Sequence, residues 1–223
     1  MPVALITGAS RGLGLAFARA LAGEGWDLVL DARNGQDLAA AAPRGAVLVT
    51  GDVIDPEHRL ALLAAVQELG HLDLLVNNAS HLGPSPQPLL RDYPLEDLRR
   101  VYDVDVFAPL ALIQLLLPLL AGGTVVNVSS DAAVEAYEGW GGYGSAKSAL
   151  DHLSAVLAQE EPGLRVHAFD PGDMRTQLHQ EAFPGEDISD RPLPEAVVPA
   201  MLRLLDLPGG RHRASDLLPV AAP

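Results

Sequence analysis

The 223-residue sequence contains no cysteine, which excludes a disulfide framework, a thiolate metal site and a cysteine nucleophile. Basic residues are also scarce. Only 15 Lys and Arg stand against 29 Asp and Glu, and the formal net charge is −14. No basic cluster of the kind that binds nucleic acid is present. The first residues have no basic segment before their apolar run, so we expect no signal peptide. These absences favour a cytoplasmic protein that does not bind nucleic acid.

Metal-ligand spacing is missing as well. The seven histidines lie far apart in the sequence, so we expect no metal site and expect the histidines to be scattered on the surface or in loops. His81 is the one that could border a pocket. Long apolar runs are also lacking, because residues 106–121 are fewer than the about 18 that span a membrane and include Gln114 and two prolines. We expect a buried helix there and no membrane association.

Short apolar runs alternate with helical patterns along the whole chain. This alternation predicts an α/β fold, a single doubly wound Rossmann-type domain over residues 1–223 with a parallel sheet of six to seven strands and helices on both faces. The expected strands are 3–6, 28–30, 46–49, 74–76, 124–128 and 164–169. The expected helices are 15–22, 37–42, 57–69, 95–120, 144–160 and 194–206. Residues 173–192 are polar and interrupted by Pro and Gly, which favours a substrate-covering loop or short helix, and 207–223 form a short C-terminal tail.

Tyr143 and Lys147 lie four residues apart, and Ser130 precedes the tyrosine by thirteen residues. On a helix, residues at i and i+4 share one face, so the phenol and the ammonium would be neighbours. A positive charge favours the phenolate, and we therefore expect the pKa of Tyr143 to fall towards neutrality. A tyrosine with such a pKa can act as a general acid or base.

A glycine-rich segment follows the first expected strand and precedes a helical pattern. Its glycines, Gly8, Gly12 and Gly14, allow a sharp turn and a close approach of the backbone to a phosphate. The N-terminus of the following helix would add free N–H groups and a positive dipole end. This context predicts a dinucleotide-binding loop.

Together these residues resemble the short-chain dehydrogenase/reductase family. Five motifs of that family match in order over residues 1–176, while the last quarter of the chain is less similar. The matches are Thr7, Gly8, Gly12 and Gly14; Asn77, Asn78 and Ala79; Ser130 after a strand; Tyr143 and Lys147; and Pro171, Gly172 and Thr176.

The resemblance implies an oxidoreductase that transfers a hydride between a nicotinamide cofactor and a carbonyl or alcohol. In such an enzyme Tyr143 would donate a proton, Ser130 would orient the carbonyl oxygen, and Lys147 would hold the nicotinamide ribose and depress the tyrosine pKa. The expected cofactor-binding residues are Gly8, Ser10, Arg11, Gly12, Leu13, Gly14, Arg33, Asp52, Val53, Asn78, Ala79, Ser80, Tyr143, Lys147, Pro171, Gly172, Met174 and Thr176.

The sequence departs from the family pattern in three places. Ser80 stands where the family has the last glycine of its Asn-Asn-Ala-Gly motif. Asp105 stands where the family usually has an asparagine, and it could place a negative charge near Lys147 or point away into solvent. We include Asp105 among the catalytic residues. From about Gly209 the chain lacks the glycine-rich closing strand of many relatives.

Charge at the second strand indicates which cofactor is bound. Arg33 follows that strand and Arg11 lies in the glycine-rich loop, and two cations near the adenosine ribose favour the 2′-phosphate of NADP. Asp31 is the counter-evidence, although the acid that selects NAD in the family would align with Ala32. We expect NADP(H), with NAD(H) as the alternative.

The expected function is thus an NADP-dependent carbonyl reductase or alcohol dehydrogenase that acts on a small molecule. A non-catalytic dinucleotide-binding regulator and an NAD-linked epimerase or dehydratase of the same fold stay open as alternatives. The substrate is not readable from the sequence, although Tyr137, Trp140, Met174 and Phe183 could form an apolar pocket wall. We expect a homodimer assembled through the two long helices, which carry Leu98, Val101, Leu112, Leu116, Leu150, Leu153 and Leu157.

Overall fold

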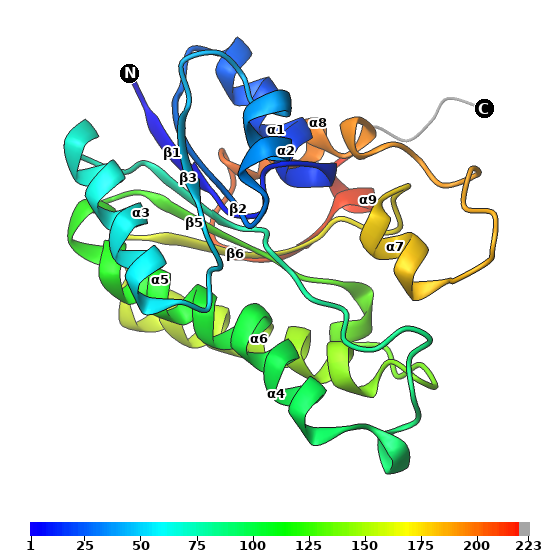
Figure 1. Ribbon diagram of the computed structural model, residues 1–223. Coiled ribbons are helices and arrows are strands. Elements are labelled where there is room, and N and C mark those ends of the chain that lie inside the picture. The colour runs from blue at the N-terminus through cyan, green and yellow to red at the C-terminus, as the bar shows by residue number, and fades with distance from the viewer. Residues whose placement is uncertain (219–223) are drawn as a thin grey trace.

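Seven parallel strands form one sheet in the computed structural model, which describes residues 1–218 (Figure 1). The strand order is β3-β2-β1-β4-β5-β6-β7, which confirms the single doubly wound domain. The order reverses between β1 and β4, and ligands of such sheets bind at this point, outside the carboxyl ends of the strands. The strands are β1 Val3–Ile6, β2 Asp27–Ala32, β3 Val47–Thr50, β4 Leu74–Asn77, β5 Thr124–Val128, β6 Arg165–Asp170 and β7 Gly210–Arg213.

Helices cover both faces of the sheet (Figure 1). On one face α1, α8 and α9 pack against β1, β2, β4 and β5 around Phe17 and Met201. On the other face α3, α5 and α6 pack around Leu62, Leu116 and Val125. The α-helices are α1 Gly12–Gly23, α2 Gly35–Ala41, α3 Pro56–Leu69, α4 Leu95–Tyr102, α5 Ala108–Leu116, α6 Gly141–Glu160, α7 Gln177–Ala182, α8 Val198–Leu204 and α9 Ala214–Leu217.

The helix expected over 95–120 is not uniform. A π-helical segment, Asp103–Phe107, joins α4 to α5, and a short 3₁₀ turn follows α5. The π-helical segment widens one turn, and such segments are frequent at functional sites. It contains Asp105, whose side chain is fully buried. The local distortion therefore coincides with one of the three departures from the family pattern.

The continuous helical run Leu95–Leu119 is long and apolar enough to cross a membrane by length and composition alone. It is longer than the apolar stretch 106–121 because it includes α4, which carries the charged residues Glu96, Asp97, Arg99 and Arg100. Half of its most apolar window is buried inside the fold.

The C-terminal segment corrects one expectation. Residues 210–213 form β7, which pairs in parallel with β6 from His167–Gly210 to Asp170–Arg213, and α9 follows directly. The chain therefore has a closing strand where we expected none. The strand reads Gly-Arg-His-Arg and has no apolar run, because it lies at the sheet edge and is half-exposed. Residues 219–223 of the expected tail lie outside the described residues.

Candidate active site

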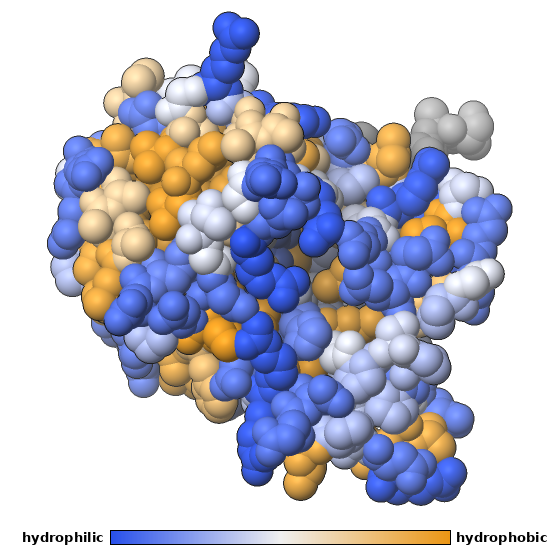
Figure 2. All heavy atoms as spheres, viewed as in Figure 1, coloured by the Kyte–Doolittle hydropathy of each residue, from blue (hydrophilic) through white to orange (hydrophobic). Residues whose placement is uncertain are grey.

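A cavity of about 1090 Å³ lies at the carboxyl ends of the strands. Figure 2 shows a hollow near the middle of this face, rimmed mainly by hydrophilic residues. Of the expected catalytic and cofactor-binding residues, all but Gly14 and Asp105 line the cavity. Those that line it are Gly8, Ser10, Arg11, Gly12, Leu13, Arg33, Asp52, Val53, Asn78, Ala79, Ser80, Ser130, Tyr143, Lys147, Pro171, Gly172, Met174 and Thr176.

The glycine-rich loop lies tightly against the end of β4. Gly8 has a φ of +64°, and a Cβ there would lie 2.9 Å from the Cα of Ala79. The side-chain amide nitrogen of Asn78, Nδ2, donates to the Thr7 carbonyl at 2.8 Å. A Cβ on Gly14 would lie 2.5 Å from this nitrogen, so Gly14 provides room for Asn78 and does not face the cavity. The loop needs its glycines to pack here and to turn sharply.

Tyr143 and Lys147 lie one turn apart on α6, as the sequence predicts, and both side chains are buried. The Lys147 Nζ is 5.5 Å from the centre of the Tyr143 ring. The same ammonium donates to the Val128 carbonyl at 2.8 Å. The end of β5 therefore fixes the lysine beneath the tyrosine.

Asp105 lies directly behind this pair. Its Oδ1 is 2.9 Å from Lys147 Nζ and accepts a 2.5 Å hydrogen bond from the Ser80 hydroxyl. Its Oδ2 accepts a hydrogen bond of 3.0 Å from the backbone N–H of His81. A buried charge needs a partner and hydrogen bonds, and Asp105 has both. Two of the three departures from the family pattern, Ser80 and Asp105, thus contact each other.

The expectation of a lowered pKa for Tyr143 was wrong. Burial raises the pKa of the Tyr143 phenol, Lys147 lowers it, and Asp105 raises it again, with a net shift above the usual value. Burial also acts on Lys147 and lowers its pKa, but Asp105 and Tyr143 outweigh this effect and hold the pKa above its usual range. The lysine acts in the expected direction, but desolvation disfavours the phenolate more strongly. Tyr143 is therefore protonated at neutral pH.

Ser130 follows β5 and lies at the cavity wall with its hydroxyl already engaged. Its Oγ donates to Asp131 Oδ1 at 3.0 Å, and the Asp131 Oδ2 accepts from the Tyr137 hydroxyl at 3.0 Å. On its other side, Arg211 of β7 donates to the Ser130 carbonyl at 3.1 Å. The unexpected closing strand thus contacts the loop that carries this serine.

Comparison with known proteins shows the family of the chain. A family model of the short chain dehydrogenases matches residues 2–187. The chain belongs to the short-chain dehydrogenase/reductase family. The benzil reductase ((S)-benzoin forming) of Saccharomyces cerevisiae is 33% identical over 99% of this chain and 86% of its own length. The sepiapterin reductase of Rattus norvegicus is 34% identical over 81% of this chain and 77% of its own. A Shigella flexneri short-chain dehydrogenase solved in complex with NADP superposes with a TM-score of 0.88 at 29% identity, covering 96% of this chain and 97% of the other.

This short-chain dehydrogenase has a cavity whose donors fit a dinucleotide phosphate. Gly12, with a φ of +58°, opens helix α1, and the loop before it carries Arg11. Backbone N–H groups at a helix N-terminus and arginine side chains are ordinary phosphate ligands. Arg33 lines the same cavity, with an exposed side chain.

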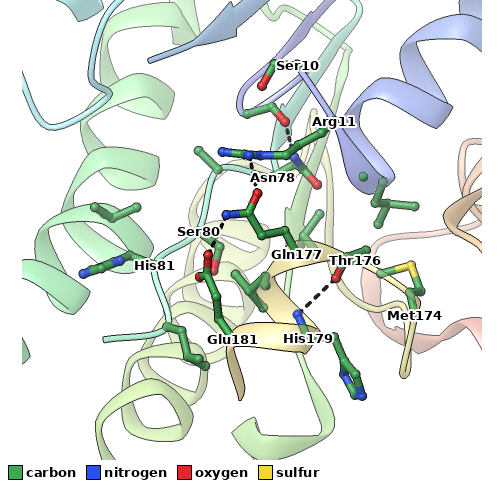
Figure 3. Close-up of a pocket in the computed structure, with 18 of the residues that line it drawn as sticks. Ser10, Arg11, Asn78, Ser80, His81, Met174, Thr176, Gln177, His179 and Glu181 are labelled. Atoms are coloured by element: carbon green, nitrogen blue, oxygen red, sulfur yellow. Dashed lines mark hydrogen bonds between the residues drawn. The ribbon is translucent and has the colours of Figure 1, made fainter. Parts of the chain in front are cut away.

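Helix α7 contributes cavity residues that we did not expect from the sequence. Arg11 donates to the side-chain oxygen of Gln177, and the Gln177 amide donates to Glu181 at 2.7 Å, so the three side chains form a row that runs down the view below Ser10 (Figure 3). The expected loop 173–192 therefore contains a short helix that contacts the glycine-rich loop. Six helical residues among Pro and Gly gave too weak a pattern to predict these contacts.

Three histidines contradict the expectation that all lie on the surface or in loops. His58, His167 and His179 are buried, on α3, β6 and α7 respectively. His81 lines the cavity, as the sequence suggested. Among residues 1–218 no group of metal-binding side chains is assembled.

An aromatic cluster lies beside the tyrosine. The Trp140 ring is 5.9 Å from the Tyr143 ring and 5.9 Å from Phe183, measured between centroids. Trp140 and Met174 line the cavity, as expected for a pocket wall, whereas Tyr137 is half-exposed and binds Asp131. The cavity is thus apolar and aromatic next to Tyr143 and polar at the glycine-rich loop.

Proposed function

We propose that this protein is an NADP(H)-dependent carbonyl reductase or alcohol dehydrogenase that works through Ser130, Tyr143 and Lys147. The observation that supports this most is the single cavity in which a buried Tyr–Lys pair, a serine and a glycine-rich phosphate loop meet. Two structural relatives with TM-scores of 0.88, from Shigella flexneri and Escherichia coli, carry NADP or NADPH in their crystals. Arg33 and Arg11 at the loop end of the cavity support the same cofactor here.

When bound, the dinucleotide supplies the hydride for carbonyl reduction. The protein residues position the carbonyl and manage its proton. Ser130 Oγ would turn from Asp131 to donate a hydrogen bond to the carbonyl oxygen. Tyr143, protonated at neutral pH, would transfer its proton to that oxygen as negative charge develops on it. The Lys147 ammonium stabilises the resulting phenolate, and Asp105 limits this stabilisation. Because the raised pKa keeps Tyr143 protonated at neutral pH, the proton donor for carbonyl reduction is present, whereas the phenolate that alcohol oxidation needs is scarce. We therefore propose carbonyl reduction as the preferred direction.

The aromatic wall indicates the substrate class. Trp140 and Tyr143 both line the cavity and pack edge to face on each other, and an aromatic substrate ring can add to such a cluster. The relatives named benzil reductase and sepiapterin reductase act on aromatic or heteroaromatic carbonyl compounds by their names. We therefore propose aryl ketones and aryl 1,2-diketones as substrates, with benzil as the first compound to test.

The direct test is a panel of aldehydes, ketones and alcohols assayed with NADPH or NADP⁺ by absorbance of the reduced cofactor. Oxidation of NADPH with benzil or a related aryl ketone is the expected result. Tight NADPH binding with no turnover of any compound would favour the regulator that the sequence left open. Turnover that is redox-neutral overall, with cofactor recycled, would instead favour an epimerase or dehydratase.

Assembly and location complete the proposal. We propose a homodimer through the outer face of α4, the π-helical segment and α6, where Leu95, Phe107 and Val156 are exposed. The interface expected from the sequence needs revision, since Val101, Leu112, Leu116 and Leu150 are core residues. We also propose a cytoplasmic location.

A further inference from the structure

An arginine of the edge strand β7 bridges the two parts of the proposed catalytic site. Arg211 Nη2 donates to the backbone carbonyl of Ser130 at 3.1 Å, and its Nε donates to Asp151 Oδ2 at 2.9 Å. Ser130 lies in the loop after β5, whereas Asp151 lies on α6. Arg211 is not among the residues that line the cavity, so it acts on the site only through the groups that it binds.

Asp151 belongs to the helix face that carries the Tyr–Lys pair. Tyr143, Lys147 and Asp151 follow one another at intervals of four residues along α6, so they share one face of the helix. The side chain of Asp151 is only 14% exposed, and a carboxylate withdrawn from water to this extent needs a charged partner. The guanidinium of Arg211 is therefore held against the helix that carries the proposed proton donor.

The other end of the bridge holds the loop of Ser130. The Ser130 carbonyl also accepts from the backbone N–H of Ala133 at 3.2 Å, and the Ser130 Oγ accepts from that of Ala132 at 3.2 Å. These two contacts stay within the loop. The contact with Arg211 instead reaches a residue 81 positions further along the chain. It therefore fixes the peptide unit after Ser130 relative to another element of the fold.

The pairing of β7 sets the position of this arginine. Ala168 of β6 pairs with Arg211, and Asp170 pairs with Arg213. Alternate residues of a strand lie on the same face, so the two arginines lie on one face of β7. Arg213 Nε donates at 3.0 Å to Asp170, which is 3% exposed and lines the cavity. A second ion pair thus anchors the end of the strand beside Arg211.

We propose that Arg211 is a positioning residue, which ties the loop of Ser130 to the α6 face that carries Tyr143 and Lys147. The proposal rests on the function proposed above, in which the Ser130 hydroxyl and the Tyr143 phenol must reach one carbonyl oxygen. A misplacement of about 1 Å at such a site can cost about 10²-fold in rate. The closing strand therefore takes part in turnover without contact with substrate or cofactor.

Arg211→Gln tests the proposal by steady-state kinetics with a substrate identified in the panel. Glutamine removes the charge and is too short to bridge both partners. We expect kcat to fall by about 10–10²-fold, while the dissociation constant of NADPH, measured by calorimetry, stays within about twofold of wild type. Arg165→Gln is the matched control and should keep the wild-type kcat. Arg165 opens the neighbouring strand β6 at the end away from the cavity, and its side chain donates to the Thr124 hydroxyl at 2.9 Å and 3.1 Å.

A double-mutant cycle separates positioning from a merely structural role. If Arg211 acts through Ser130, its removal has little left to disturb once the Ser130 hydroxyl is gone. In a Ser130→Ala background Arg211→Gln should therefore lower kcat by less than about threefold further. An equal loss in both backgrounds, or a wild-type kcat for Arg211→Gln, would overturn the proposal. Arg211→Lys keeps the charge beside Asp151 and takes the place of Arg211→Gln in the cycle if that variant does not fold.

Hydrogen exchange tests the bridge without any substrate. The backbone N–H groups of residues 132–135 donate to Ser130 and Asp131 within the loop. In Arg211→Gln these amides should exchange about tenfold faster or more, because the loop opens more often, while the amides of α3 keep their wild-type rates. Unchanged exchange in the loop would overturn the bridge. Failure of the proposed function is a separate result, since it would appear as no turnover of any compound in the panel or as wild-type turnover by Ser130→Ala.

Discussion

The carboxylate of Asp105 forms a fully buried ion pair with the ammonium of Lys147, with 2.9 Å between Oδ1 and Nζ. The Ser80 hydroxyl and the His81 backbone N–H also donate hydrogen bonds to this carboxylate, at 2.5 Å and 3.0 Å. The lysine that should promote the phenolate of Tyr143 thus shares its charge with a second anion. This relationship sets the direction and pH dependence that we propose for the enzyme.

Asp105→Asn tests that relationship through a pH–rate profile. Asp105 raises the pKa of Tyr143, so removing its charge should lower that pKa. The basic limb of alcohol oxidation, which needs the phenolate, should then move to lower pH. Asp103→Asn, a change of the same kind in the same π-helical segment, is the control and should leave the profile in place. Superimposable profiles for wild type and Asp105→Asn would show that the charge does not act on catalysis.

Arg33→Ala tests the proposed cofactor. Losing a hydrogen-bonded charge partner should weaken NADPH binding by about 1.5–3 kcal/mol and change NADH binding little. Arg33 is the better target of the two arginines because Arg11 already donates to Gln177. Calorimetric titration is the measurement, with Arg44→Ala as the control, since Arg44 is exposed and outside the residues that line the cavity. Equal losses for both cofactors would argue against a 2′-phosphate site at Arg33.

His167→Leu tests a prediction about acid stability. His167 is fully buried on β6, both its ring nitrogens lack a hydrogen-bond partner, and its ring is 5.3 Å from that of His212. Burial, followed by His212 and Arg165, lowers the pKa of His167 to about 4. Because the folded-state pKa lies below the unfolded value, the native state binds this proton more weakly, and stability should fall as pH drops from about 6.5 towards 4.

The size of this effect follows from the shift. Up to about 3 kcal/mol of the free energy of unfolding should be lost over that pH range, and His167→Leu should remove this part of the loss. Urea unfolding at a series of pH values measures it. His152→Leu on the exposed side of α6 is the control. Identical acid sensitivity in His167→Leu and wild type would contradict the assignment.

Phe107→Glu tests the proposed assembly. Phe107 is 57% exposed and lies in a groove lined by Leu95, Leu98, Arg99, Tyr102 and Asp103. A glutamate there would be buried without a partner in a two-fold interface, so the variant should become monomeric. Light scattering at micromolar concentration should report a dimer for wild type and a monomer for the variant. A monomeric or tetrameric wild type would refute the assembly.

Much of the fold could be predicted from the sequence because buried parallel strands are short apolar runs. Val3–Ile6 and Thr124–Val128 were expected with the observed bounds. Strand β7 could not be predicted, because Gly-Arg-His-Arg has no apolar pattern and its place comes from pairing with β6. Helix α7 falls within residues 173–192, where a loop or short helix was expected, but its contact with Arg11 through Gln177 could not be predicted from six residues.

The site divides in the same way. Motif spacing placed Tyr143, Lys147 and the glycine-rich loop at one cavity, because the carboxyl ends of parallel strands share one sheet edge. The pairs Ser80–Asp105 and Asp31–His58 lie 25 and 27 residues apart in sequence, and only packing brings them together. The predicted direction of the Tyr143 pKa shift was wrong for that reason, since a four-residue spacing reveals neither the burial of Tyr143 nor the nearby Asp105.

Tyr143→Phe tests the central claim most directly. The variant keeps the ring that packs on Trp140 and loses only the hydroxyl that would donate the proton. With a substrate identified in the panel, we predict a loss of turnover of about 10²–10⁴-fold with NADPH binding nearly unchanged, whereas the control Tyr102→Phe on α4 keeps wild-type turnover. Turnover by Tyr143→Phe at the wild-type rate would contradict the account.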